Sequence, residues 1–158
     1  MIQIQFLILP LLQLAILCSA SIGSAHVRGQ LFCRGKPMAG ERVQLWEKNF
    51  ALFDTLVAQN ATDEDGFFSL KGSVNEMIGH PIIYAYFINY CTPGVQTSFM
   101  TCGNSIKVFL PNEFITSGKD PKHIFNLDEL ELSTMKTEQL GMEMLIHFYF
   151  GHKECRPL

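Results

Sequence analysis

The sequence lacks several patterns that would point to common classes of protein. No Cys-x-x-Cys pair occurs among its five cysteines, which argues against a zinc site. Its 12 Lys and Arg residues are scattered and the net charge is −3, which argues against a nucleic-acid or polyanion partner. No internal repeat, low-complexity run or long helical period is present. The absence of repeats and of a long helical period favours a single β-rich domain.

The first 25 residues have the pattern of a secretory signal. They contain no charged side chain, and Phe6–Leu17 forms an apolar centre. This centre is shorter than the roughly 20 residues that a membrane-spanning helix needs. Gly23–Ala25 supplies the small residues that signal peptidase requires, so we predict a signal peptide at residues 1–25 with cleavage after Ala25. Cleavage after Ala20 is the alternative.

Removal of this signal leaves four cysteines in a mature chain that is long enough for one domain. An even number of cysteines in an oxidising compartment predicts disulfides, and four cysteines allow three pairings. Cys91 and Cys102 are close in sequence, and a bridge closing the loop between them would contribute about 3 kcal/mol of stability. We therefore predict a Cys91–Cys102 disulfide, which leaves Cys33 to pair with Cys155.

A turn that leads into a strand is the clearest local signal. Thr62–Leu70 contains a cluster of acidic residues, then Gly66, then alternating apolar residues. Asp side chains bond their own backbone and glycine accepts a positive φ, so this pattern favours a tight turn followed by a strand. Asn60 begins an N-glycosylation sequon, Asn60-Ala61-Thr62, and the neighbouring turn favours its exposure.

Short apolar segments alternate with turn residues along the rest of the chain, which predicts an all-β sandwich. The segments 27–33 and 42–47 suggest an antiparallel hairpin. Ser73 and Glu76 have the spacing of a capping box and predict one short helical turn. The segment 81–90 is apolar on both faces, as in a central strand that is buried front and back. The strands that we expect are 27–33, 42–47, 54–59, 67–70, 81–90, 105–111 and 130–132.

The end of the chain has no clear strand or membrane pattern. Met142–Phe150 is apolar but too short to span a bilayer, and charged residues flank it. We expect residues 139–158 to form an extension that is either packed on the domain and pinned by Cys155, or free to contact a membrane or a partner.

A series of short motifs runs through the mature chain at characteristic spacings. They are Val27–Cys33 with Pro37; Val43 and Leu45; Thr62, Asp63, Gly66, Phe68, Leu70 and Gly72 with Glu76; Cys91 and Cys102; Ile106, Val108, Leu110, Pro111, Phe114, Ile115 and Gly118; and Phe125, Leu127, Leu130 and Leu132. Their order and spacing resemble the nematode transthyretin-like family, a group of small secreted proteins. The resemblance implies a domain at residues 26–138 that folds as a transthyretin-like (immunoglobulin-like Greek-key) sandwich of about seven to eight strands with one short helical turn.

The same resemblance implies secretion or display at the cell surface, and it implies no shared catalytic residue. Two positions depart from the residues that the family often has: Asn89 replaces a His and Asp128 replaces a Gly. Related sandwiches that hydrolyse a purine-breakdown product carry a His/Arg site and end in Tyr-Arg-Gly-Ser. This chain ends in Cys-Arg-Pro-Leu, so we do not expect 5-hydroxyisourate hydrolase activity.

The histidines and acidic residues do not predict a catalytic or metal centre. His26 is expected at a flexible N-terminus, and none of the five histidines has a close partner at a ligand spacing. The acidic residues before Gly66 suggest a calcium loop, but Gly72 stands where an EF-hand needs a Glu. We therefore expect no metal, no cofactor and no enzymatic activity.

These observations predict a secreted or cell-surface binding module that is not an enzyme. Its ligand is expected to be an extracellular protein, a lipid or a small hydrophobic molecule, with no membrane span after signal cleavage. The alternative is a structural component of a surface coat. Phe50, Leu52 and Phe53 lie in an expected loop or edge and form the candidate contact patch.

Overall fold

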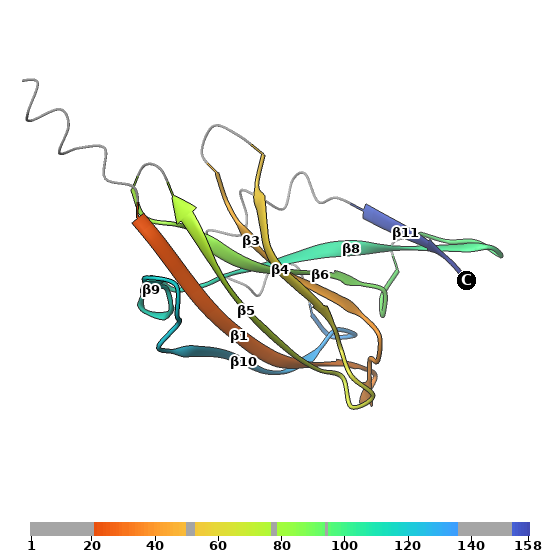
Figure 1. Ribbon diagram of the computed structural model, residues 1–158. Helices are drawn as coiled ribbons and strands as arrows, with labels where there is room; N and C mark the ends of the chain where they lie inside the picture. Colours follow the sequence, from red (N-terminus) through yellow and green to blue (C-terminus); the bar gives the residue numbers. More distant parts are fainter. Residues whose placement is uncertain (1–20, 50–52, 77–78, 94, 136–152) are drawn as a thin grey trace, which may run out of the picture.

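The computed structural model describes residues 21–49, 53–76, 79–93, 95–135 and 153–158, and two β-sheets make up most of this part (Figure 1). The all-β prediction is confirmed. Within these ranges, no helix has the length and apolar character needed to cross a membrane. Several expectations lie outside the described residues: the leader before Ser21, the contacts of Phe50 and Leu52, and the extension between residues 139 and 152.

The first sheet is built around β1 (Ser21–Cys33). β5 (Phe67–Glu76) pairs with it in antiparallel orientation, and β10 (Ile124–Glu131) pairs with it in parallel orientation. β2 (Lys36–Pro37) and β9 (Thr116–Ser117) add short antiparallel pairings. β1 therefore has a neighbour on each side along most of its length.

The second sheet has the strand order β11-β8-β6-β3-β4, with β7 paired to β8. All of its pairings are antiparallel. β6 lies in the middle and six of its seven residues are buried, which confirms the prediction of a central strand buried on both faces. The strands are β3 (Arg42–Glu47), β4 (Thr55–Ala61), β6 (Ile83–Asn89), β7 (Val95–Gln96), β8 (Met100–Phe109) and β11 (Lys153–Pro157).

The core lies between the two sheets, and it follows from the two-residue period of the strands. In β1, Val27 and Leu31 are fully buried while Arg28 between them is exposed. In β3, Val43 and Leu45 are fully buried, as expected from the sequence. The other buried members of the core are Ala25, Phe68, Leu70, Ile83, Ala85, Phe87, Cys91, Ile106, Val108, Leu110 and Leu132.

The predicted turn before β5 is confirmed. One carboxylate oxygen of Asp63 accepts hydrogen bonds from the backbone N–H groups of Asp65 (3.0 Å) and Phe67 (2.8 Å). Gly66 has a φ of 80°, and a Cβ at this position would lie 2.5 Å from the carbonyl oxygen of Leu31. Only glycine satisfies both the positive φ and this close approach.

Two local predictions were wrong. Segments 27–33 and 42–47 do not form a hairpin, because β1 belongs to the first sheet and β3 to the second. Ser73 and Glu76 do not begin a helical turn, because β5 runs through both and pairs with the first residues of β1. The helical turn in the described part is a 3-10 turn at Asn112–Phe114.

The predicted disulfide pairing was also wrong. The structure joins Cys33 to Cys91 (S–S 2.00 Å) and Cys102 to Cys155 (S–S 2.04 Å). Cys102 and Cys155 are register partners in neighbouring strands, while Cys33 ends β1 in the opposite sheet and reaches Cys91 just after β6. Sequence proximity favoured the loop pairing, but strand register and sheet packing decide which sulfur atoms meet.

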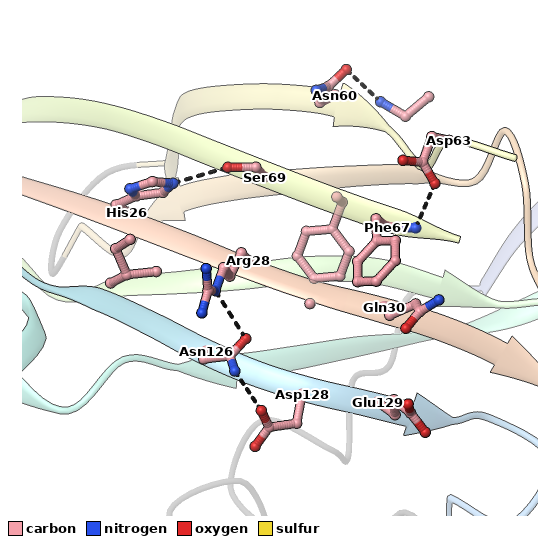
Figure 2. Close-up of a pocket in the computed structure, with 14 residues that line it drawn as sticks. His26, Arg28, Gln30, Asn60, Asp63, Phe67, Ser69, Asn126, Asp128 and Glu129 are labelled. Carbon is pink, nitrogen blue, oxygen red and sulfur yellow. Dashed lines mark hydrogen bonds between the residues drawn. The ribbon is translucent and has the colours of Figure 1, made fainter. Parts of the chain in front are cut away.

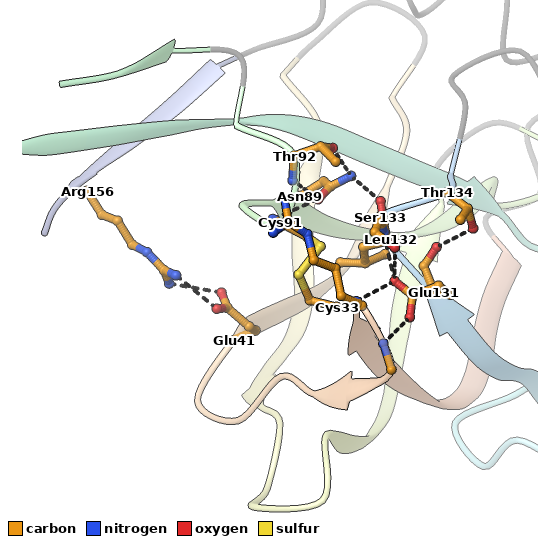
Figure 3. Close-up of a disulfide and its surroundings, with 12 residues drawn as sticks. Cys33, Glu41, Asn89, Cys91, Thr92, Glu131, Leu132, Ser133, Thr134 and Arg156 are labelled. Carbon is orange, nitrogen blue, oxygen red and sulfur yellow. Dashed lines mark hydrogen bonds and ion pairs between the residues drawn. A yellow bond between two sulfur atoms is a disulfide. The ribbon is translucent and has the colours of Figure 1, made fainter.

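Asn89 organises the backbone beside the Cys33–Cys91 bridge (Figure 3). The buried amide oxygen of Asn89 accepts hydrogen bonds from the N–H groups of Cys91 (2.9 Å) and Thr92 (3.2 Å). Its amide nitrogen donates to the carbonyl oxygen of Leu132 (3.0 Å). The role of Asn89 is therefore structural.

Candidate groove on the outer face of the first sheet

A groove of about 980 Å³ lies over the outer face of the first sheet (Figure 2). β1, β5 and β10 form its floor, and the end of β4 and the turn before β5 supply further residues. The alternation that sends Val27 and Leu31 into the core turns His26, Arg28 and Gln30 toward the groove. The strand pairing therefore places a row of polar side chains on this face.

His26 and Ser69 meet across β1 and β5. The Nε2 atom of His26 lies 2.9 Å from the Oγ atom of Ser69. Partial burial, together with the positive charges of Lys71 and Arg28, lowers the pKa of His26 below its usual value. The imidazole therefore favours its neutral form, in which one nitrogen donates a hydrogen bond and the other accepts one.

The β1–β10 side of the groove carries a chain of polar contacts. Arg28 donates from Nε to the amide oxygen of Asn126 (3.3 Å), and Asn126 donates to the carboxylate of Asp128. Asp128 has a φ of 51° and lies opposite the register shift between Arg28 and Gln30. A positive φ is the conformation that Gly adopts without strain, and Asp is among the residues that tolerate it.

The rest of the groove lining combines polar and apolar groups. Asn60 is exposed there, and its amide oxygen accepts a hydrogen bond from the N–H of Ala61 (2.9 Å). Gln30 donates to the carbonyl oxygen of Asp65 (2.6 Å). Phe67 is 53 % exposed and Ile124 is 43 % exposed, so each offers apolar surface to a ligand.

The groove can hold a ligand by hydrogen bonds and apolar contact. Its lining includes one Arg and three carboxylic acids, Asp63, Asp128 and Glu129. The described residues contain no group of three or more His, Cys, Asp or Glu side chains that could hold a metal ion. The described contacts of His26 include no carboxylate that would orient its ring toward Ser69, and a nucleophile–base pair normally has such a group.

The residues that we singled out from the sequence lie in different parts of the structure. Asn60 lines the groove, whereas Phe53 is 97 % exposed outside it. His26, Arg28 and Gln30 were not expected as site residues from the sequence, because His26 was assigned to a flexible terminus. The alternation that identified Val27 and Leu31 as buried already assigns these three side chains to the opposite face.

Comparison with known proteins identifies the family. The transthyretin-like family matches residues 28–111 of this chain. The chain belongs to this family. The match extends from β1 through β8, so it includes Arg28, Asn60 and Phe67 of the groove but not β10.

Three transthyretin-like proteins of Caenorhabditis elegans are similar to this chain. Transthyretin-like protein 46 is 34% identical over 71% of this chain and 61% of its own length. Transthyretin-like protein 33 is 31% identical over 69% and 73% of the two chains, and transthyretin-like protein 1 is 32% identical over 72% and 74%. The chain thus spans about three fifths of the first of these relatives and about three quarters of the other two.

A solved structure, a 9R-lipoxygenase from Cyanothece PCC8801, matches this transthyretin-like chain with a TM-score of 0.39 and 12% identity. It covers 75% of this chain and 18% of the lipoxygenase chain, and at this level the likeness carries no argument about fold or function.

Proposed function

We propose that this transthyretin-like protein is secreted and acts as a non-enzymatic binding module for an extracellular or cell-surface ligand. The groove over β1, β5 and β10 is the observation that carries the proposal. Concave sites that combine apolar surface with a few placed polar groups are typical of ligand binding. Family membership supports a transthyretin-like module, and the signal-like leader supports secretion.

The chemistry of the groove favours a protein ligand over a small hydrophobic molecule. Donors such as Arg28 and acceptors such as Asp128 both line the groove, so a purely apolar ligand would displace water from their remaining polar atoms without replacing its hydrogen bonds. In the described part, β10 pairs only with β1 and leaves its other edge open. An extended peptide segment can pair with such an edge while its side chains reach the groove.

A non-enzymatic role is the better explanation of the contact between His26 and Ser69. The two side chains stand on the open face of a sheet, and their hydrogen bond satisfies both polar groups. A hydrolase that used Ser69 as its nucleophile would also need hydrogen-bond donors that stabilise an oxyanion beside it. The contact is consistent with a polar binding surface.

The proposal is tested with the secreted, oxidised protein against a panel of extracellular and cell-surface proteins, with phospholipid vesicles as a separate arm. Phe67→Ser and Ile124→Ser each remove a large, exposed apolar side chain from the groove. The matched controls are Phe53→Ser and Leu56→Ser, because these residues are 97 % and 42 % exposed and lie outside the groove. We expect the groove variants to weaken binding at least tenfold and the controls to retain it.

Three results would contradict this proposal. Binding that is lost in Phe53→Ser but kept in Phe67→Ser would move the site to the exposed loop. Light scattering that shows regular assembly, with no binding to the panel, would favour a surface-coat component. Hydrolysis of 5-hydroxyisourate that disappears in Ser69→Ala would make the protein an enzyme.

A further inference from the structure

The first strand starts upstream of the cleavage point that the sequence favours. Ser21 to Ala25 pair with Glu76 to Gly72 of β5 in unbroken register. Ser24 and Ala25 are fully buried, and Ser24 donates a hydrogen bond to the carbonyl oxygen of Thr116 (3.3 Å). Cleavage after Ala25 would remove this part of the central strand and leave one end of β5 without a partner.

Gly23 shows how closely this segment is packed. A Cβ at Gly23 would lie 2.2 Å from the Cγ atom of Pro81 and 3.3 Å from a side-chain carbon of Ile115. Gly23 and Ser24 are also paired with Ser117 and Thr116 of β9. The segment thus has the contacts of a structural strand.

Two carboxyl groups meet at the same end of the sandwich. Glu47 ends β3 with only 2 % of its surface exposed, and its Oε1 atom has no hydrogen-bond partner in the described part of the chain. Burial and the neighbouring carboxyl of Glu76, which ends β5, raise the pKa of Glu47 to about 7. A buried carboxyl beside a second carboxyl either keeps its proton or is compensated by a positive charge.

The backbone of β1 places the nitrogen of Ser21 beside the backbone of Glu76. The carbonyl oxygen of Ile22 accepts a hydrogen bond from the N–H of Gly118 (2.9 Å), on the side of the strand away from β5. Backbone groups of successive strand residues face opposite sides, so the nitrogen of Ser21 faces β5. Its register partner there is Glu76.

We propose that the secretory leader is cleaved between Ala20 and Ser21, and that the new α-ammonium of Ser21 pairs with the carboxylates of Glu76 and Glu47. Water adds across the peptide bond, so that Ala20 leaves with a carboxylate and Ser21 keeps an ammonium. Cys18 and Ala20 provide the small residues at the −3 and −1 positions that signal peptidase requires. The proposal rests on the secretion proposed above.

The cleavage is tested by expressing residues 1–158 in insect cells and measuring the intact mass and N-terminal sequence of the protein in the medium. We expect a chain that starts at Ser21. A secreted chain that starts at His26 would overturn this inference and leave secretion intact. A chain that stays in the cells with residues 1–20 attached would overturn both.

The ion pair is tested by inserting Gly-Ser between Ala20 and Ser21. Cleavage after Ala20 then leaves β1 unchanged but moves the ammonium two residues away from the carboxylates. We expect the melting temperature at pH 7 to fall by several degrees, and the difference to vanish when both proteins carry Glu47→Gln and Glu76→Gln. Equal melting temperatures for the wild type and the insertion variant would overturn the pairing even where Ser21 is the first residue.

Discussion

Arg156 and Glu41 form a two-point ion pair: the two terminal nitrogens of the guanidinium lie 3.0 Å from the two carboxylate oxygens (Figure 3). The same guanidinium stacks over the ring of Tyr90 at 4.0 Å. Arg156 belongs to β11, and Glu41 lies just before β3, so the pair reaches across the second sheet. With the Cys102–Cys155 bridge, it fixes the last strand to the domain.

Arg156→Lys should reduce the free energy of unfolding by about 1 kcal/mol. Lysine keeps the charge but loses the two-point geometry and the flat stacking surface, so the change isolates these two contributions. Urea unfolding measures the difference. Lys71→Ala is the matched control, because its ion pair with Asp120 (3.6 Å) is exposed and should change stability by no more than about 0.5 kcal/mol. Equal effects of the two changes would show that the Arg156–Glu41 geometry does not matter.

Glu131 predicts a dependence of stability on acid pH. Hydrogen bonds from Ser133 and from the N–H groups of Gly35 and Arg34 lower its pKa to about 2 (Figure 3). Because the folded-state pKa lies below the ordinary value of 4.5, this stabilisation is full above about pH 4.5 and is lost as the pH falls toward 2. Glu131→Gln should therefore lower the melting temperature at pH 7 and change it little near pH 2.

Glu129→Gln serves as the control for this prediction. Glu129 lies in the same strand and lines the groove, and the described contacts include no hydrogen bond to its carboxylate. We expect a melting temperature close to that of the wild type at both pH values. A difference at pH 7 that persists unchanged at pH 2 in Glu131→Gln would show that the carboxylate charge is not the cause.

The raised pKa of Glu47 predicts that stability depends on pH in the opposite direction when no ammonium lies near this residue. Its pKa of about 7 in the fold lies above the ordinary 4.5, so its carboxyl favours the folded state at low pH and this contribution is lost as the pH rises from about 4.5 to 7. In the Gly-Ser insertion variant, Glu47→Gln should raise the free energy of unfolding by about 2 kcal/mol at pH 7.5 and leave it nearly unchanged at pH 4. Guanidinium unfolding at both pH values measures this. A Gln variant that is less stable at pH 7.5 would contradict the interpretation.

Local signals in the sequence predicted much of the fold. The acidic turn before Gly66 and the alternation of β3 depend on contacts within a few residues, so they were visible without knowledge of the partners. The capping box at Ser73 failed because β5 has its partner in Ser21–Ala25, which sequence reasoning had assigned to the cleaved leader. The same assignment hid His26 as a groove residue. Placing the end of the leader at Ala25 therefore accounts for both wrong expectations in the domain.

Contacts that form only through sheet packing could not be predicted from the sequence. Cys33 and Cys91 are 58 residues apart; Cys33 ends β1 in the first sheet and Cys91 follows β6 of the second, and nothing near either cysteine specifies the other. Glu47 and Glu76 are a similar case, since each ends a strand in a different sheet. Asn60 was found because a sequon is local, but its place beside a groove was not.

The disulfide pairing makes the last prediction. Peptide mapping without reduction should recover Cys33 linked to Cys91 and Cys102 linked to Cys155, in place of the Cys91–Cys102 loop that we expected from sequence. Because the bridges span 58 and 53 residues, the chain-entropy estimate gives each about 4 kcal/mol. Replacing Cys33 and Cys91 together by Ser should cost more than this estimate, because Cys91 is buried in the core and the bridge connects the two sheets. Replacing Cys102 and Cys155 should stay nearer to it, because β8 and β11 remain paired through their backbones. Guanidinium unfolding of the two double variants measures both losses of unfolding free energy. A larger loss for the Cys102/Cys155 variant would show that anchoring β11 stabilises the fold more than the link between the sheets does.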